Sequence, residues 1–156
     1  MLAKETVDEI IFRTMNTRNR LMLELMARGG MRVGEVLNLT PSDIQERTLA
    51  IKSPKSSRVG EAVYVPRKLL VRLTDSVKAN KKGNSDRISP ISYVAAWSMV
   101  KKSGNLVKIQ LRSHDLRRHA ATYTSRSGTP IETVSKVILR HANLSTTQRY
   151  WQSERF

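Results

Sequence analysis

The apolar residues of this chain recur mostly at helical spacing, and this pattern limits the possible folds more than any other feature of the sequence. The clearest stripe, at i, i+1, i+4 and i+5, consists of Leu21, Met22, Leu25 and Met26. Gly29-Gly30 directly follows it, as expected where a helix ends. The sequence therefore predicts a buried helix that stops at this glycine pair.

Two β-like runs interrupt the helical pattern, at Thr48–Lys52 and Glu61–Val65. A basic turn rich in serine, proline and lysine separates them, which is typical of a hairpin with a long tip. Helical patterns resume after Pro66. We therefore expect an α+β fold that is mainly helical, with one small antiparallel β-hairpin.

Capping patterns predict where several helices begin. Thr6-Val7-Asp8-Glu9 has the spacing of a capping box, so a first helix should begin there and turn Met15 inward. Ser89-Pro90 predicts a cap and a first-turn proline for a later helix. A further helix should begin at Ser113 or Asp115. The expected core of the helix after Ser89-Pro90 includes Val94, Trp97 and Val100.

Length and composition indicate a single domain. A chain of 156 residues can bury enough surface to fold without disulfides or metals. It has no cysteine, which excludes thiolate metal sites and cysteine nucleophiles. No apolar run is long enough to span a bilayer, and the first ten residues lack the apolar stretch of a signal peptide. We therefore expect a cytoplasmic domain with no membrane contact.

Charge is distributed unevenly along the chain, which carries 28 lysines and arginines against 13 acids, a formal net charge of +15. Seven residues of each sign fall in residues 1–49, which leaves 21 bases and 6 acids for residues 50–156. A field of this sign attracts polyanions, and nucleic acid is the expected partner. A basic domain that is merely soluble is the alternative from charge alone.

The three histidines of the chain all fall between residues 114 and 141, among several arginines. In His114-Asp-Leu-Arg117 the spacing places an imidazole and a guanidinium on one face of a helix. Such a pair suits a phosphate, because the guanidinium fork binds two oxygens while the imidazole makes a third bond. The same spacing also occurs on ordinary solvated helix faces. A metal site is not expected, since His114 and His119 point about 140° apart around a helix.

Residues of this chemistry recur in a fixed order along the chain. Arg32 follows Gly29-Gly30, with Glu35 three residues later. A basic hairpin, the His-x-x-Arg motif, Leu-x-His141 and Tyr150 then follow. In this order and spacing, over about residues 6–151, the chain resembles the tyrosine recombinases, also called the phage integrase family.

The resemblance implies a division of labour in the cutting of DNA. Tyr150 is the expected nucleophile, which attacks a phosphodiester and forms a 3′-phosphotyrosyl bond. Arg32 and Arg117 are expected to hold the non-bridging oxygens, and His141 to donate a further hydrogen bond. His114 is expected to bond the same phosphate or to help remove the proton of Tyr150. Two successive transesterifications conserve the bond energy, so no nucleotide, metal or other cofactor is expected.

Two further residues of the site follow from the family pattern. A lysine at the hairpin tip protonates the leaving 5′-oxygen in this family, and Lys55, in the turn, is the expected donor. Lys52, at the end of the first predicted strand, is the alternative. Arg32 and Arg117 together form the expected phosphate clamp. Glu35 is expected to fix a residue of this clamp without touching DNA.

The chain departs from the family pattern beside the second arginine. Arg118 stands where the family usually has a histidine, and at i+4 from His114 it could compete with Arg117 for the clamp. The assignment of Arg117 therefore depends on the family pattern. His119 is expected to have a structural role.

The resemblance also implies an organisation and a set of partners. Residues 1–156 correspond to a single catalytic domain, without the N-terminal core-binding domain of full-length members. Double-stranded DNA is the expected partner, with a homotetramer on DNA when the protein is full length and a location at the nucleoid. A type IB topoisomerase is the alternative among enzymes. A DNA-binding module with decayed catalysis is the alternative from another class.

Overall fold

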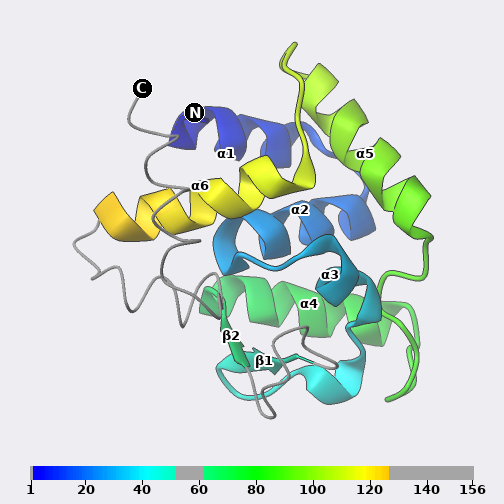
Figure 1. Cartoon of the computed structure of the whole chain (residues 1–156). Helices are drawn as coiled ribbons and strands as arrows, with labels where there is room; N and C mark the ends of the chain where they lie inside the picture. The colour runs from blue at the N-terminus through cyan, green and yellow to red at the C-terminus, as the bar shows by residue number, and fades with distance from the viewer. Residues whose placement is uncertain (1, 52–61, 127–156) are drawn as a thin grey trace.

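The computed structural model describes residues 2–51 and 62–126. In these ranges the chain forms helices and one pair of strands (Figure 1). In chain order the elements are α1 (Lys4–Arg13), α2 (Thr17–Gly29), α3 (Val33–Asn38), the 3-10 turn η1 (Pro41–Asp43), β1 (Thr48–Ala50), β2 (Ala62–Tyr64), α4 (Arg67–Ala79), α5 (Tyr93–Asn105) and α6 (Ser113–Arg126). The expected α+β class, mainly helical with a small antiparallel hairpin, is confirmed.

Helix α2 lies at the centre of the molecule, with α6 and α1 on one side and α4 on the other (Figure 1). Among the described elements, α2 packs most extensively against α6. Asn16 caps its first turn, where its side-chain oxygen accepts the backbone N–H of Asn19 at 3.0 Å. Its buried residues include the predicted stripe of Leu21, Met22, Leu25 and Met26. The predicted end of this helix is also confirmed, because α2 stops at Gly29.

The two strands pair antiparallel, with Leu49 opposite Val63 and both side chains fully buried. The hairpin predicted at Thr48–Lys52 and Glu61–Val65 is thus confirmed, with shorter strands in the described residues. Strand β2 lies against the end of α2. A Cβ on Gly29 would come within 2.8 Å of Val65 Cγ1, so the missing side chain allows this close approach.

The predicted start of the first helix is wrong. Helix α1 begins at Lys4, and its N-cap residue Ala3 makes no side-chain cap. Met15 lies beyond the end of α1 and its side chain is 88% exposed, although the sequence predicted it to face inward. The backbone is already extended at Thr14, so the helical spacing of apolar residues does not continue to Met15.

Helix α5 also differs from the prediction. Ser92 caps it by accepting the backbone N–H of Ala95 at 3.1 Å, so Ser89-Pro90 is not its cap. Val100 is buried as expected, but Val94 is 72% exposed and Trp97 is 50% exposed. The outer face of α5 instead carries these two side chains, with Lys101 Nζ 5.5 Å from the centre of the Trp97 ring. None of the described helices is both long and apolar enough to cross a membrane.

Candidate functional site

The turn after α2 determines the geometry of the candidate site. Gly30 has a φ of 67°, a left-handed conformation that glycine adopts without strain. The N–H of Gly30 donates to the carbonyl of Met26 at 3.1 Å, and that of Met31 donates to Leu25 at 3.3 Å. These bonds close a tight turn. Met31 is buried after it, and Arg32 follows directly.

Arg32 is the N-cap residue of α3, and Glu35 holds it in two ways. Glu35 Oε1 accepts the backbone N–H of Arg32 at 2.8 Å, and Glu35 Oε2 lies 3.3 Å from Arg32 Nη1. The Glu35 side chain is 9% exposed and that of Arg32 is 30% exposed. The carboxylate therefore orients a guanidinium that can still reach solvent or a ligand.

Arg117 comes from α6 and reaches the same turn. Its Nε donates to the carbonyl oxygen of Gly30 at 2.8 Å, across 87 residues of sequence. Arg117 is 7% exposed, and this bond fixes its Nε against the Gly30 turn. The contact brings Arg117 beside the turn that leads into Arg32. Two predicted clamp residues are therefore neighbours although they are far apart in the sequence.

His114 lies at the surface in the first turn of α6, one helical turn before Arg117. Desolvation of its ring by the surrounding protein lowers the pKa of His114 below its ordinary value, and the charges of Arg118, Arg112 and Arg117 lower it further. Asp115 acts in the opposite direction. The imidazole is therefore neutral at pH 7, with one nitrogen able to accept a proton.

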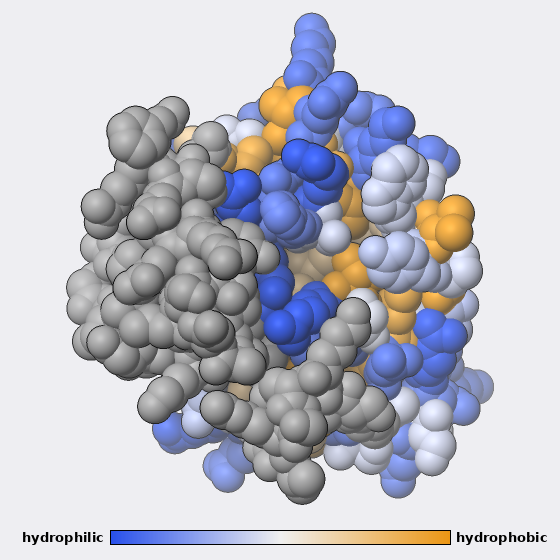
Figure 2. Space-filling view, viewed as in Figure 1, coloured by the Kyte–Doolittle hydropathy of each residue, from blue (hydrophilic) through white to orange (hydrophobic). Residues whose placement is uncertain are grey.

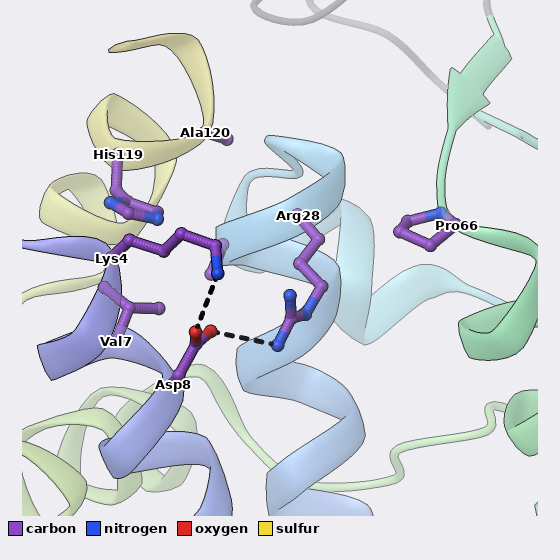
Figure 3. A pocket seen from close by; sticks show the side chains of 8 residues that line it. Lys4, Val7, Asp8, Arg28, Pro66, His119 and Ala120 are labelled. Atoms are coloured by element: carbon purple, nitrogen blue, oxygen red, sulfur yellow. Dashed lines mark hydrogen bonds and ion pairs between the residues drawn. The ribbon is translucent and has the colours of Figure 1, made fainter. Parts of the chain in front are cut away.

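Arg118 and His119 follow Arg117 on α6 but take different positions. Arg118 is half-buried, and its charge affects His114. His119 points away from the Gly30 turn, because two residues along a helix correspond to a rotation of about 200°. It lines, together with Lys4 and Arg28, a small pocket of about 140 Å³ (Figure 3).

Ion pairs occupy one wall of this pocket. Asp8 Oδ2 is 3.3 Å from Lys4 Nζ, and Asp8 Oδ1 is 3.4 Å from Arg28 Nη2 (Figure 3). His119 therefore faces the contact between α1 and α2 rather than the two predicted clamp arginines.

The remaining predicted site residues lie outside the described part of the chain. These are Lys55 and its alternative Lys52, His141 and Tyr150. The structure therefore brings together Arg32, Glu35, His114 and Arg117, and gives no geometry for the others. Strongly hydrophilic side chains gather on the middle of the face shown in Figure 2, where α2, α3 and α6 meet in Figure 1.

Sequence reasoning missed two partners of these residues. The carbonyl of Gly30 holds Arg117, and a backbone carbonyl leaves no signal in the sequence. Asp115 accepts the backbone N–H of Arg112 at 3.0 Å. The spacing of three residues between Arg112 and Asp115 is the same as between Arg32 and Glu35, so this contact had a detectable signal. Within residues 2–51 and 62–126, no three histidine or acidic side chains meet as a metal site.

Comparisons with known proteins give a consistent result. The family model described as the phage integrase family matches residues 1–155. Tyrosine recombinase XerA of Pyrococcus horikoshii is 29% identical over 162 residues, which cover 96% of this chain and 55% of that protein.

Two solved structures have the same fold. One is XerH site-specific recombinase bound to difH substrate in a pre-cleavage complex, with a TM-score of 0.78 and 21% identity over 96% of this chain and 49% of the other. The second is the catalytic domain of bacteriophage HP1 integrase, with a TM-score of 0.72 and 21% identity over 97% of this chain and 86% of the other.

The chain spans about half the length of the curated relatives that it matches. The family match covers Arg32 and Arg117. It also covers the predicted site residues that lie outside the described ranges, namely Lys55, its alternative Lys52, His141 and Tyr150. The fold agrees with the resemblance stated from the sequence. The chain therefore belongs to the phage integrase family, whose members include the tyrosine recombinases.

Proposed function

We propose that residues 1–156 are the catalytic domain of a tyrosine site-specific recombinase that cleaves and rejoins double-stranded DNA. Tyr150 attacks a phosphodiester, forms a 3′-phosphotyrosyl bond and releases a 5′-hydroxyl. Attack by a 5′-hydroxyl on that bond then restores a phosphodiester and releases Tyr150. The family match over residues 1–155 supports this proposal.

The observation that carries the proposal is the hydrogen bond from Arg117 to Gly30, next to Arg32. It places the Arg117 side chain against the turn that leads into Arg32, whose own guanidinium is paired with Glu35. Two fixed cations at one turn are suited to the charge that develops on a phosphate in a pentacovalent transition state. Since both are held before DNA binds, little reorganisation is needed during the reaction.

Three other residues complete the proposed chemistry. His114, neutral at pH 7, bonds the phosphate or accepts the proton of Tyr150. Lys55 protonates the leaving 5′-oxygen, and His141 donates a hydrogen bond to a non-bridging oxygen. The roles of Lys55 and His141 rest on the family pattern in the sequence.

Double-stranded DNA is the proposed substrate and partner. The net charge of +15 favours a polyanion, and a structural neighbour is described as bound to its difH substrate. On DNA, four copies of the full-length protein are proposed to act together, in the nucleoid.

Replacing the nucleophile tests the proposal directly. Tyr150→Phe removes one oxygen, so it should abolish the covalent adduct with a nicked suicide substrate while DNA binding persists. The adduct is measured as a shifted band on a denaturing gel. An adduct that survives in Tyr150→Phe refutes this nucleophile, and Tyr123→Phe is then the next variant to examine. A wild-type chain that binds DNA but forms no adduct would support the DNA-binding module instead.

A further inference from the structure

Helices α3 and α6 begin in the same way. At α3, the backbone N–H of Arg32 donates to the Glu35 carboxylate three residues later, at 2.8 Å. At α6, the backbone N–H of Arg112 donates to Asp115 Oδ2, also three residues later, at 3.0 Å. In both cases the acid also faces the arginine side chain, and Arg112 Nε lies 4.0 Å from Asp115 Oδ2.

The two proposed site residues of α6 are held very differently. Arg117 is buried and bonded to Gly30, so its position depends on the packing of α6 against α2. His114 is exposed in the first turn, where backbone N–H groups lack partners within the helix and where helices fray. The Arg112 side chain beside it is 76% exposed. His114 belongs to this first turn, so the bonds that close the turn contribute to its position.

We propose that Asp115 is a positioning residue for the reaction, because its carboxylate closes the first turn of α6 and so places His114 at the phosphate. This inference rests on the proposed function, in which His114 contacts the phosphate or Tyr150. The role proposed for Asp115 requires no contact with either group. Its backbone N–H also donates to the Arg112 carbonyl at 3.0 Å, so Asp115 and Arg112 are joined in both directions.

Two substitutions separate the cap from the charge. Asp115→Asn keeps an oxygen that can accept the Arg112 N–H, whereas Asp115→Ala removes it. Both remove the negative charge that opposes Arg112, Arg117 and Arg118 around His114. Both variants should therefore lower the pKa of His114, but only Asp115→Ala should loosen the helix start.

Asp86 offers a matched control. Its Oδ2 accepts the backbone N–H of Gly83, again three residues earlier, at 2.7 Å in the loop between α4 and α5. Asp86→Ala removes the same kind of bond without changing α6.

The experiment combines NMR of the full chain with the suicide-substrate assay. Amide hydrogen exchange at Arg112 should quicken about five- to tenfold in Asp115→Ala, the scale of one lost cap. Adduct formation should slow by a similar factor, and Asp115→Asn should restore both rates to within about twofold. DNA binding should change little in either variant, because the clamp arginines are held elsewhere.

Three results would overturn the inference. They are unchanged exchange and cleavage in Asp115→Ala, equal slowing in Asp115→Asn, and equal slowing in Asp86→Ala. If the wild-type chain forms no adduct, the proposed function fails, and with it the role in cleavage. The exchange at Arg112 then still decides separately whether Asp115 closes the helix.

Discussion

The carboxylate of Glu24 is buried between α2 and α4. Loss of its closest arginine partner should lower the free energy of unfolding more than the loss of an exposed ion pair. The side chain is 1% exposed and faces three arginines. Arg72 on α4 donates both terminal nitrogens to the two carboxylate oxygens. Arg28 Nε lies at 3.5 Å and Arg20 Nε at 4.0 Å.

Arg72→Met leaves this carboxylate inside the protein without its closest partner. Removal of one member of a buried ion pair costs about 3–5 kcal/mol. Arg20 and Arg28 remain, and the Arg72 side chain is 44% exposed, so both factors reduce the cost. We expect a loss of about 2–3 kcal/mol in the free energy of unfolding. In a domain of this size the melting temperature should fall by about 4–12 °C.

Urea denaturation of the full chain measures the effect, with an unchanged m-value as the sign that only stability has changed. Glu9→Gln is the control, because it breaks the exposed pair with Arg13 at 3.2 Å and should cost less than about 1 kcal/mol. The double variant Glu24→Leu with Arg72→Met should recover most of the loss, since it leaves no buried charge. The reasoning is refuted if Arg72→Met costs no more than Glu9→Gln.

Three other predictions concern the proton donor, the need for a metal ion and the dependence of stability on pH. Lys55→Ala should slow cleavage by roughly 10²–10⁴-fold. A substrate with a bridging 5′-sulfur should restore the rate of this variant, because a thiolate leaves without needing a proton. Rescue of Lys52→Ala instead would make Lys52 the proton donor. Cleavage should proceed in EDTA, since Arg32 and Arg117 supply the positive charge, and a loss that Mg²⁺ restores would contradict this mechanism. His114 binds its proton less tightly in the folded chain than in the unfolded chain, so stability should fall as pH drops through the ordinary histidine pKa, about 6.5. His114→Gln should flatten this part of a stability profile measured by urea denaturation, and an unchanged profile would exclude His114 as its source.

The sequence predicted those parts of the fold that depend on local patterns. The helix ending at Gly29-Gly30, the hairpin and the start of α6, predicted at Ser113 or Asp115 and found at Ser113, were recognised from spacing and turn residues. The errors occur where two local signals compete. Ser89-Pro90 has the composition of a cap, yet Ser92 is the residue whose side chain caps α5.

Exposure was harder to predict than helix formation. Val94 and Trp97 share a helix with buried Val100, but which face of α5 packs inward depends on the position of α3 and α1. A sequence pattern with apolar residues all round a helix does not contain that information. Glu24 is the opposite case, because an acid among Leu21, Met22 and Leu25 is buried through a partner 48 residues away.

The candidate site was predicted from order rather than from contacts. Arg32 and Arg117 were paired through the family pattern, and the structure adds that Arg117 donates to the carbonyl of Gly30, two residues before Arg32. No spacing rule gives that contact, because one partner is in α6 and the other is a backbone atom of the turn after α2.

The bond between Arg117 and Gly30 also has a consequence for the order in which the protein is completed during synthesis. Residues 1–50 contain α2, but the surface of α2 that α6 covers stays uncovered until residues after 113 leave the ribosome. The carbonyl of Gly30 cannot bond to Arg117 until the 87 residues that follow it have been synthesised. A nascent chain that ends before residue 117 has Arg32 without Arg117, so it holds only one of the two arginines of the proposed phosphate clamp. The proposed pairing of both arginines at one phosphate can therefore arise only late in synthesis, together with the burial of the central helix.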